Sequence, residues 1–323
     1  MKYLVIRLSS LGDVVLTLPG LTSVIAASPG AEFHLLTSTP YADVCRCVPG
    51  LTVWTPEKGE SLWDCGRRLS AEAFTHVYDL QGGSRGLTLR LALAGPTSSL
   101  ERYPLRRRWW VWTHTGPTKP LPLRSDEVAS LLGVSPQRPC LTLPAEMATW
   151  AEEVLPGERS RVALIPGARW VNKRWPPEHF HRLAGTLLSS GWEVVVVGDA
   201  TELPLLQGAA GDLPVRVCAE RDLRRCAAVL ARCNVAVGGD SGLIHLAEGV
   251  GTPVLMLFGP TRSDVGFAPS LPTSRVLERD LPCRPCHVHG GDRCPRSDHA
   301  CLAEIYPEEV AKILPRQFEG CVF

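Results

Sequence analysis

The sequence has no long uninterrupted apolar run. A membrane-spanning helix needs about 20 consecutive apolar residues, and no stretch of the 323 residues is that long. The longest candidate, residues 235–258, is interrupted by Asp240, His245 and Glu248. We therefore expect no membrane span, and any membrane contact would involve the protein surface.

The sequence also lacks an uncharged secretory signal. The segment from Lys2 to Ala27 has a suitable length, but Arg7 and Asp13 fall inside it, where the apolar core of a signal peptide carries no charge. Without export, the 12 cysteines are expected to be thiols or metal ligands rather than disulfides. The sequence therefore predicts a cytoplasmic protein.

Positive and negative residues are nearly balanced in number. There are 34 Lys and Arg residues against 33 Asp and Glu residues, a net charge of +1. No global field then favours a nucleic-acid partner, and any anion must bind at a local site. The chain is long enough for two domains, and its 45% hydrophobic residues can fill two cores.

Short apolar strands alternate with helical segments through most of the chain. We expect strands near residues 2–7, 32–37, 76–80, 161–165, 193–197, 234–237 and 253–258, and helices near 13–28, 147–154, 178–190, 222–233 and 241–250. Residues 102–122 mix Arg, Trp and Pro and are expected to be irregular. The alternation predicts two doubly wound α/β domains, residues 1–156 and 157–323, with a linker near 155–157.

Two loops of the second half carry candidate ligand-binding residues. Ligands of doubly wound sheets bind beyond the carboxyl ends of the strands. The first loop, residues 166–175, combines Gly167 with Arg169 and Lys173, which suits a diphosphate; the alternative is a solvated basic loop. The second turns at Gly198 and could approach a nucleoside or be a simple strand-to-helix connection.

A third loop is the most informative. Gly239 follows a strand and lets the backbone approach a ligand, while Ser241 and Gly242 begin a helix whose free N–H groups favour a phosphate. Asp240 could accept a hydrogen bond from a ribose hydroxyl or act only as an N-cap. His245 lies one turn into the helix, where simple packing is the alternative to catalysis.

The first half places carboxylates at two expected strand ends. Gly12 and Asp13 follow the first strand, and Asp13 could serve as a general base for a sugar hydroxyl or only cap the helix. Asp79, Gln81 and Gly82 end another strand at the same edge of the sheet. We therefore expect these residues to line one ligand site.

A cationic and aromatic patch lies in the segment that we expect to be irregular. Its members are Arg102, Arg106, Arg107, Arg108, Trp109, Trp110 and Trp112. Such a patch suits a phosphorylated glycolipid at a membrane surface. The alternative is a solvated loop whose Trp side chains pack into the core.

Four cysteines lie close together near the C-terminal end of the sequence. Cys283, Cys286, Cys294 and Cys301 have a spacing that favours a zinc or iron site in a cytoplasmic protein. His287, His289 and His299 could replace some of them as ligands. The alternatives are disulfides, or reduced thiols that pack a loop against the sheet.

Four short motifs follow one another along the sequence: residues 11–15 with Pro19, residues 79–82, residues 173–176, and residues 239–243 with 258–261. Together they resemble the motifs of the ADP-heptose:lipopolysaccharide heptosyltransferases, glycosyltransferase family nine. The cysteines from 283 to 301 resemble those of the heptosyltransferase II branch. The resemblance implies the GT-B fold, in which two Rossmann-like doubly wound domains face an interdomain cleft.

The resemblance also implies an activity: inverting transfer of heptose from ADP-L-glycero-D-manno-heptose to the lipopolysaccharide inner core, with no metal or other cofactor required. Asp13 matches the family's presumed base. Donor-binding positions would be Gly167, Arg169, Lys173, Gly198, Gly239, Asp240, Ser241, Gly242 and His245. Acceptor-binding positions would be Gly12, Asp79, Gln81, Gly82, Arg106 and Arg107.

The expected acceptor is a Kdo- or heptose-bearing lipid A core, which places the protein peripherally on the inner face of the inner membrane. Two alternatives share the fold: a transferase for another nucleotide sugar, and a noncatalytic nucleotide-sugar-binding protein. A zinc-ribbon nucleic-acid binder fits the cysteines but not two α/β domains with a net charge of +1.

Overall fold

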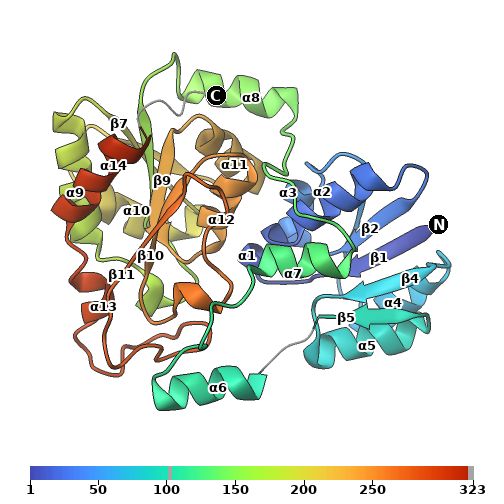
Figure 1. The fold of residues 1–323 in the computed structure, drawn as a ribbon. Coiled ribbons are helices and arrows are strands. Elements are labelled where there is room, and N and C mark those ends of the chain that lie inside the picture. Colours follow the sequence, from blue (N-terminus) through green and yellow to red (C-terminus); the bar gives the residue numbers. More distant parts are fainter. Residues whose placement is uncertain (101–103, 319–323) are drawn as a thin grey trace. The chain divides into compact units, whose positions relative to one another are not determined.

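The computed structural model of the chain describes residues 1–100 and 104–318. The described residues form two compact α/β units (Figure 1). The units are Met1–Arg102 with Arg124–Thr142, and Tyr103–Leu123 with Leu143–Phe323. The two-domain α/β prediction thus agrees with the observed architecture.

The first unit is built on a parallel five-stranded sheet in the order β3-β2-β1-β4-β5. Its strands are β1 Lys2–Ile6, β2 Glu32–Leu36, β3 Leu51–Trp54, β4 His76–Asp79 and β5 Thr97–Ser99. The central strand β1 is apolar because helices cover both faces of the sheet, and its Leu4, Val5 and Ile6 are fully buried. The chain reverses its direction of strand addition between β1 and β4, so these neighbours form the switch point of the sheet.

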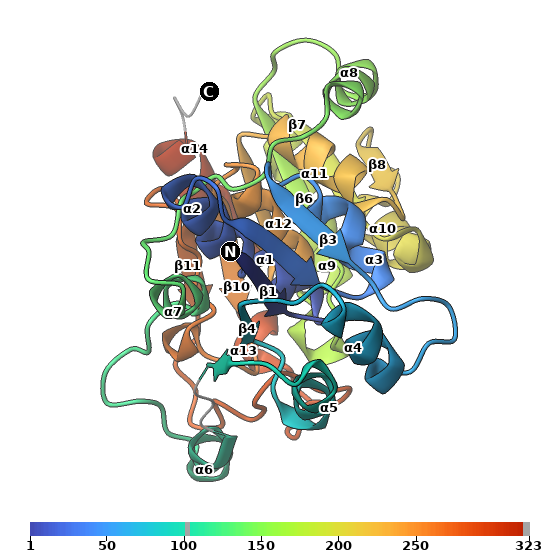
Figure 2. The same cartoon turned by 90° about the vertical axis from the view of Figure 1, so that its right-hand side faces the viewer.

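Six helices are described in the first unit. They are α1 Leu11–Val15, α2 Leu18–Ala27, α3 Thr39–Cys45, α4 Leu62–Ser70, α5 Gly83–Leu93 and α7 Arg124–Leu131. Figure 2 shows α4 and α5 side by side, and their buried residues share a core with β1 and β4. On the other face, α2 packs against α7.

The second unit has a parallel six-stranded sheet in the order β11-β10-β9-β6-β7-β8. Its strands are β6 Arg161–Ile165, β7 Glu193–Gly198, β8 Arg216–Ala219, β9 Val235–Gly239, β10 Val254–Phe258 and β11 Arg275–Glu278. The four valines of β7 are all buried, as expected for a strand covered on both faces. The switch point of this sheet lies between β6 and β9.

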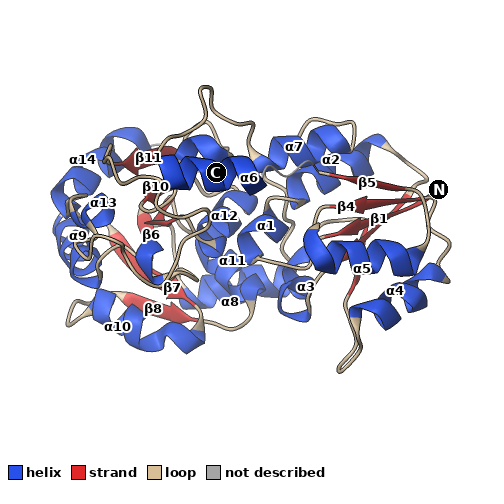
Figure 3. Cartoon of the chain, turned by 90° about the horizontal axis from the view of Figure 1, so that it is seen from below, coloured by secondary structure: helices blue, strands red, loops and turns tan. Residues whose placement is uncertain are grey.

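Helices cover both faces of the second sheet (Figure 3). The helices described in the second unit are α6 Pro104–Thr113, α8 Ala145–Val154, α9 Pro177–Ser189, α10 Leu203–Ala210, α11 Leu223–Ala231, α12 Gly242–Gly249, α13 Ala300–Ala303 and α14 Pro307–Phe318, with 3₁₀ turns η1 Val171–Lys173, η2 Ala200–Glu202 and η3 Ser263–Val265. Asp222 caps α11 as predicted, because its side chain accepts from the Arg224 amide.

Two features differ from the expected organisation. Residues 104–113, expected to be irregular, form helix α6; Arg102 lies outside the described residues. The predicted boundary after residue 156 would assign α6 and α8 to the first domain, whereas both group with the second unit. Helix α8 packs on α11, and the Arg225 guanidinium lies 4.9 Å from the centre of the Trp150 ring.

Among residues 1–100 and 104–318, no helix is long and apolar enough to cross a membrane. The longest described helix is α9, with 13 residues, and it is amphipathic.

Candidate active site

In the first unit, Asp13 lies at the switch point, in the first turn of α1 just beyond β1. Its Oδ1 atom is 2.6 Å from Nη2 of Arg7, the residue that follows β1. Its Oδ2 atom accepts from the Ser10 hydroxyl at 3.1 Å and from the Ser10 amide at 3.4 Å. Asp13 therefore contributes to the start of its helix, as the capping alternative predicted, and remains partly exposed.

The ionisation of Asp13 is controlled by two opposing effects. Burial raises the pKa of the carboxyl, but the charge and hydrogen bond of Arg7, together with the charge of Arg124 and the Ser10 amide, lower it below the ordinary value. Arg7 is held in place because Nη1 donates to the backbone oxygen of Leu80. Asp13 is therefore a carboxylate at neutral pH.

Asp79 does not belong to an open acceptor site. Its carboxylate is fully buried at the end of β4, where Oδ1 accepts from the amides of Gln81 and Gly82 at 2.9 and 2.7 Å. Its Oδ2 atom lies 3.2 Å from Nε of Arg90. A Cβ atom at Gly86 would meet this carboxylate. Asp79 therefore shapes the turn after β4, and its role toward the acceptor stays a prediction from the sequence.

Gln81 also has a structural partner. Its side-chain oxygen accepts from the amides of Leu8 and Ser9 at 2.9 and 3.2 Å, and so ties the ends of β4 and β1 together. Gly82 has a positive φ of 55°, which explains the glycine there. Gly12 lies within α1, where its carbonyl accepts from Leu16. Of the predicted first-unit positions, Asp13 is the one with an available carboxylate.

In the second unit, the end of the sheet at the switch point brings together side chains from the segments that follow β6, β9 and β10. Lys173, after β6, places Nζ 2.5 Å from Oδ2 of Asp240, after β9. Nε2 of His245 lies 3.6 Å from Oδ1 of the same carboxylate, and the Thr261 hydroxyl donates to Oδ2 at 3.3 Å. Ser241 is the N-cap residue of α12. We call these five residues the second-unit site.

The second-unit site is buried and polar. Burial raises the pKa of Asp240, but Lys173 and His245 outweigh it and lower the pKa well below the usual range. Within the described part of the chain, the Ser241 hydroxyl and Nδ1 of His245 are buried without a hydrogen-bond partner. Buried polar atoms are normally paired, so these two atoms have capacity for a ligand.

The glycines of these loops serve close packing of the protein with itself. A Cβ atom at Gly239 would overlap the carbonyl oxygen of Lys173, and one at Gly238 would come within 2.8 Å of the carbonyl oxygen of Ile165. At Gly198, a Cβ atom would come within 2.5 Å of Leu206. Gly238 and Gly239 therefore let β9 pack closely against β6 and the loop after it, and Gly198 lets β7 pack against α10. The ligand contacts that the sequence assigned to Gly198 and Gly239 stay predictions.

A carboxylate beside the first loop was missed by the sequence analysis. Glu202 ends η2 and lies 3.1 Å from Nη2 of Arg174, and a Cβ atom at Gly167 would meet its carboxylate. Burial raises the pKa of Glu202, the Asp199 charge adds to this effect, and Arg174 opposes it. Its position three residues after Asp199, in a loop beyond β7, was the available signal. Arg169, by contrast, is exposed beside the Trp170 ring.

The cysteine-rich segment holds the second-unit site in shape. Asn172, next to Lys173, is buried; its Oδ1 atom accepts from the Gly291 amide at 2.8 Å, and its side-chain nitrogen lies 3.2 Å from Nδ1 of His287. Arg284 is also buried and donates to the carbonyl oxygens of Gly259 and Thr261, both at 2.6 Å. Residues 279–301 therefore brace the loop after β6 and the loop after β10.

The four cysteines lie near one another in the structure. The pKa of Cys286 is raised to about 12 by burial and by the other three thiols, and Nδ1 of His287 is 3.3 Å from its sulfur. Among the described residues, no group of three or more His, Cys, Asp or Glu side chains is arranged to hold an ion. The four cysteines of this segment are free thiols. The metal remains a prediction from the sequence.

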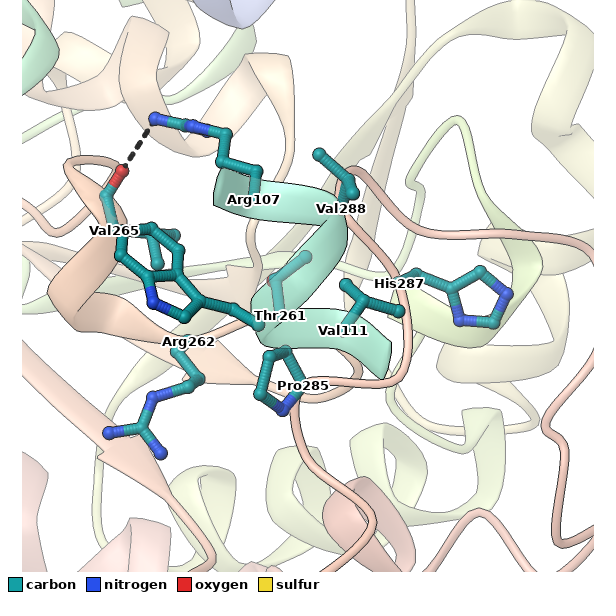
Figure 4. A pocket seen from close by; sticks show the side chains of 9 residues that line it. Arg107, Val111, Thr261, Arg262, Val265, Pro285, His287 and Val288 are labelled. Carbon is teal, nitrogen blue, oxygen red and sulfur yellow. Dashed lines mark hydrogen bonds between the residues drawn. The ribbon is translucent and has the colours of Figure 1, made fainter. Parts of the chain in front are cut away.

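The two Arg side chains predicted to bind acceptor lie on α6, in the second unit. Arg107 donates to the carbonyl oxygen of Val265 at 3.1 Å and lies over the Phe267 ring at 5.4 Å. Arg106 lies 5.0 Å from the centre of the Trp110 ring. Figure 4 shows a small pocket between α6 and two loops, lined by Arg107, Trp110, Val111, Thr261, Arg262, Val265, Pro285, His287 and Val288.

Comparison with known proteins places the chain in a family. The family glycosyltransferase family 9 (heptosyltransferase) matches residues 128–292. A lipopolysaccharide heptosyltransferase 1 of Pseudomonas aeruginosa is 29% identical over 88% of this chain and 86% of its own length. A lipooligosaccharide heptosyltransferase 2 of Haemophilus influenzae is 30% identical over 53% of each chain.

The fold agrees with this assignment. The solved structure of Escherichia coli ADP-heptose lipopolysaccharide heptosyltransferase II has a TM-score of 0.74, at 22% identity, and covers 98% of both chains. Both sheets of this chain therefore follow the GT-B pattern of two Rossmann-like domains. Relatives named as type 1 and as type 2 both match, so the heptosyltransferase II branch stays a prediction. The family resemblance is confirmed: the chain belongs to glycosyltransferase family 9 and is a heptosyltransferase.

Proposed function

We propose that this enzyme transfers heptose, with inversion at the anomeric carbon, from ADP-L-glycero-D-manno-heptose to the inner core of lipopolysaccharide. The names of its relatives, which are lipopolysaccharide and lipooligosaccharide heptosyltransferases, support the sugar and the acceptor class. One structural observation carries the proposal: the buried Lys173–Asp240 pair lies beside an unpartnered Ser241 hydroxyl at the start of α12.

The second unit binds the donor in this proposal. The N-terminus of α12 offers backbone N–H groups and a partial positive charge, and Ser241 adds a free hydroxyl, which together suit the diphosphate. Lys173 neutralises the charge that develops on the leaving ADP. Asp240 holds Lys173 in position and, with His245, can bond the hydroxyls of the donor. Glu202 can accept from a nucleoside hydroxyl.

The first unit binds the acceptor, with Asp13 as general base. A hydroxyl oxygen of the acceptor attacks the anomeric carbon from the face opposite ADP, its proton passes to Asp13, and the bond from the anomeric carbon to the diphosphate oxygen breaks with its electron pair leaving on ADP. Asp13 is ionised and partly exposed, as a base must be. Arg7 fixes the direction of the carboxylate.

The chemistry of transfer in this proposal needs no metal and no other cofactor. The leaving diphosphate is stabilised by Lys173 and the start of α12, which perform the electrostatic work that a cation would otherwise do. The acceptor is a lipid-linked core carrying Kdo or heptose, so the enzyme works in the cytoplasm at the surface of the inner membrane. Nucleic acid has no part in it.

The main alternative is a family member that uses another nucleotide sugar. A donor panel tests this: purified enzyme is incubated with a heptose-deficient core acceptor and ADP-heptose, ADP-glucose or UDP-glucose. Of the three donors, we expect only ADP-heptose to give a product, whose mass exceeds that of the acceptor by one heptose. Nuclear magnetic resonance should show that its anomeric configuration is inverted relative to the donor. A product formed equally well from another donor, or with retained configuration, would contradict the proposal.

A further inference from the structure

Helix α6 presents an apolar stripe that its own unit does not cover. Leu105, Trp109 and Trp112 are exposed to 78%, 58% and 74%. Their spacing of four and three residues places them on one face of the helix. The two Trp rings lie 5.2 Å apart between centroids, so the aromatic surface is continuous. Single exposed apolar residues are ordinary, but a contiguous patch of this kind marks an interaction surface.

The opposite face of α6 is already anchored. Trp110 is buried, Arg107 donates to the Val265 carbonyl oxygen, and Nδ1 of His114 lies 3.3 Å from the carbonyl oxygen of Pro285. Figure 4 shows Arg107 and Val111 on the inner side of the helix, facing the two loops. The helix is therefore held with its Trp-rich stripe outward, and these residues have no further core to enter in their own unit.

The charge beside the stripe is of one sign. Helix α6 contains three Arg residues and no acidic residue. Arg106 and Arg108 are exposed and flank the stripe. Basic residues next to a membrane surface are attracted to anionic headgroups, and Trp side chains favour the interface because they combine an apolar ring with a polar N–H group. This combination distinguishes α6 from an ordinary exposed helix.

We propose that the outer face of α6 docks on an anionic phospholipid bilayer, with Leu105, Trp109 and Trp112 entering the headgroup region and Arg106 and Arg108 contacting lipid phosphates. The helix lies in the plane of the interface, as amphipathic helices of peripheral enzymes do. The inference rests on the proposed function in one respect, namely that the acceptor is carried by a membrane lipid. The inner side of α6 lines the pocket that includes Thr261, so docking places the donor-binding unit against the membrane.

The test is flotation of the full chain with vesicles of phosphatidylcholine alone and with added phosphatidylglycerol, and without any lipopolysaccharide. We expect binding to the anionic vesicles that weakens as salt is added. The variant Trp109→Ala/Trp112→Ala should bind about tenfold more weakly. The affinity of Arg108→Ala for the anionic vesicles should fall about fivefold, which is the effect of removing one cation near the membrane surface.

A matched control exists on α4, in the first unit. Trp63 is also an exposed Trp, and Arg67 lies exposed one turn later, but Asp64 lies between them. The variant Trp63→Ala/Arg67→Ala should float like wild type, and circular dichroism checks that each variant folds. Equal binding of wild type and the α6 variant, or no binding by wild type, would overturn the proposal. Binding that appears only in a further arm, with core lipopolysaccharide added to the vesicles, would also overturn it, because the face would then be an acceptor subsite.

Failure of the docking proposal is separable from failure of the proposed function. ADP release from ADP-heptose with a water-soluble core oligosaccharide needs no membrane, so the Trp109→Ala/Trp112→Ala variant should retain wild-type turnover in that assay. The same variant should turn over lipid-linked acceptor in anionic vesicles more slowly. A loss in the water-soluble assay would instead assign these residues to the active site and contradict a docking role.

Discussion

Nζ of Lys173 lies 2.5 Å from Oδ2 of Asp240, and both side chains are almost fully buried. The two residues are 67 positions apart in the chain, and the pairing of β6 with β9 brings them together. A buried ion pair costs desolvation of both charges and is weak support for stability by itself. A pair retained beside unpartnered polar atoms is more consistent with ligand binding.

Removing Lys173 alone should damage both stability and catalysis. Lys173→Met leaves the Asp240 charge buried without its main partner, which we expect to cost about 3–5 kcal/mol of unfolding free energy. The double variant Lys173→Met/Asp240→Asn should regain most of that stability, while turnover stays down by about 10²–10³. Urea unfolding and single-turnover kinetics measure the two effects. Recovery of turnover in the double variant would show that the pair serves stability alone.

The pH dependence of stability gives a further check on this pair. Because the pKa of Asp240 is lowered in the folded protein, its carboxylate stabilises the fold above the unfolded value of about 3.9. This contribution is lost as the pH falls through the folded pKa. In Lys173→Met, the effect of burial on the pKa of Asp240 is less strongly opposed. The loss of unfolding free energy relative to wild type should therefore be largest at neutral pH and should shrink in acid. A deficit independent of pH would contradict the assignment.

The Arg7–Asp13 pair predicts a shift in the pH profile of turnover. In wild type, Arg7 keeps the pKa of Asp13 low, so the base stays ionised across the whole working range. Arg7→Gln removes the cation and leaves burial to raise the pKa, so the acid limb of kcat/KM should move up by about 1–3 pH units. Arg85→Gln, which removes an exposed Arg beside Ser9, is the matched control. An unchanged limb in Arg7→Gln would mean that Asp13 is not the titrating base.

Asp79 is expected to matter for folding rather than for acceptor affinity. Asp79→Ala removes a buried carboxylate that accepts from two turn amides and pairs with Arg90 of α5, and should cost about 2–4 kcal/mol. Asp199 makes a similar turn contact with the Thr201 amide at the surface, and Asp199→Ala should cost less than about 1 kcal/mol. Thermal unfolding compares the two. A raised acceptor KM in a stable Asp79→Ala variant would restore the direct role predicted from the sequence.

The cysteine segment can be tested by alkylation and metal analysis together. Burial raises the pKa of Cys286 to about 12 and that of Cys301 to about 11, so both thiols should react slowly with iodoacetamide at mildly alkaline pH. The matched control is Cys226 of α11, a buried thiol outside the segment, which should react equally slowly whether or not a chelator is present. A metal site would instead protect all four segment cysteines equally, and a chelator would abolish that protection. Together with about one zinc or iron per chain, this result would establish the metal site predicted from the sequence.

Much of the fold could be predicted because each central strand is a short apolar run. The valines of β7 and the Asp222 cap of α11 are local signals, and both predicted the correct element. Helix α6 was missed because its Arg, Trp and Pro composition resembles a loop, although the spacing of Leu105, Trp109 and Trp112 fits one helical face. Periodicity would have been the better guide there.

The candidate site was predictable in its residue types but not in its pairings. The sequence places Asp13 and Asp79 at strand ends, but which of them is open depends on neighbouring elements: Asp79 is enclosed by Arg90 and Gly86 of α5. The role of Asn172 depends on a contact with residue 291, which no local pattern encodes. Long-range partners of this kind require the structure.

The most direct test of the central claim is acceptor-dependent release of ADP from ADP-heptose. Wild type, Asp13→Ala and Asp13→Asn are compared with and without a heptose-deficient, Kdo-bearing core acceptor, after the fold of each variant has been checked. We predict release by wild type that requires the acceptor and that falls by about 10²–10⁴ in both variants, the range expected for loss of a general base. Near-normal release by folded Asp13→Ala, or no release by wild type with any core acceptor, would contradict the account.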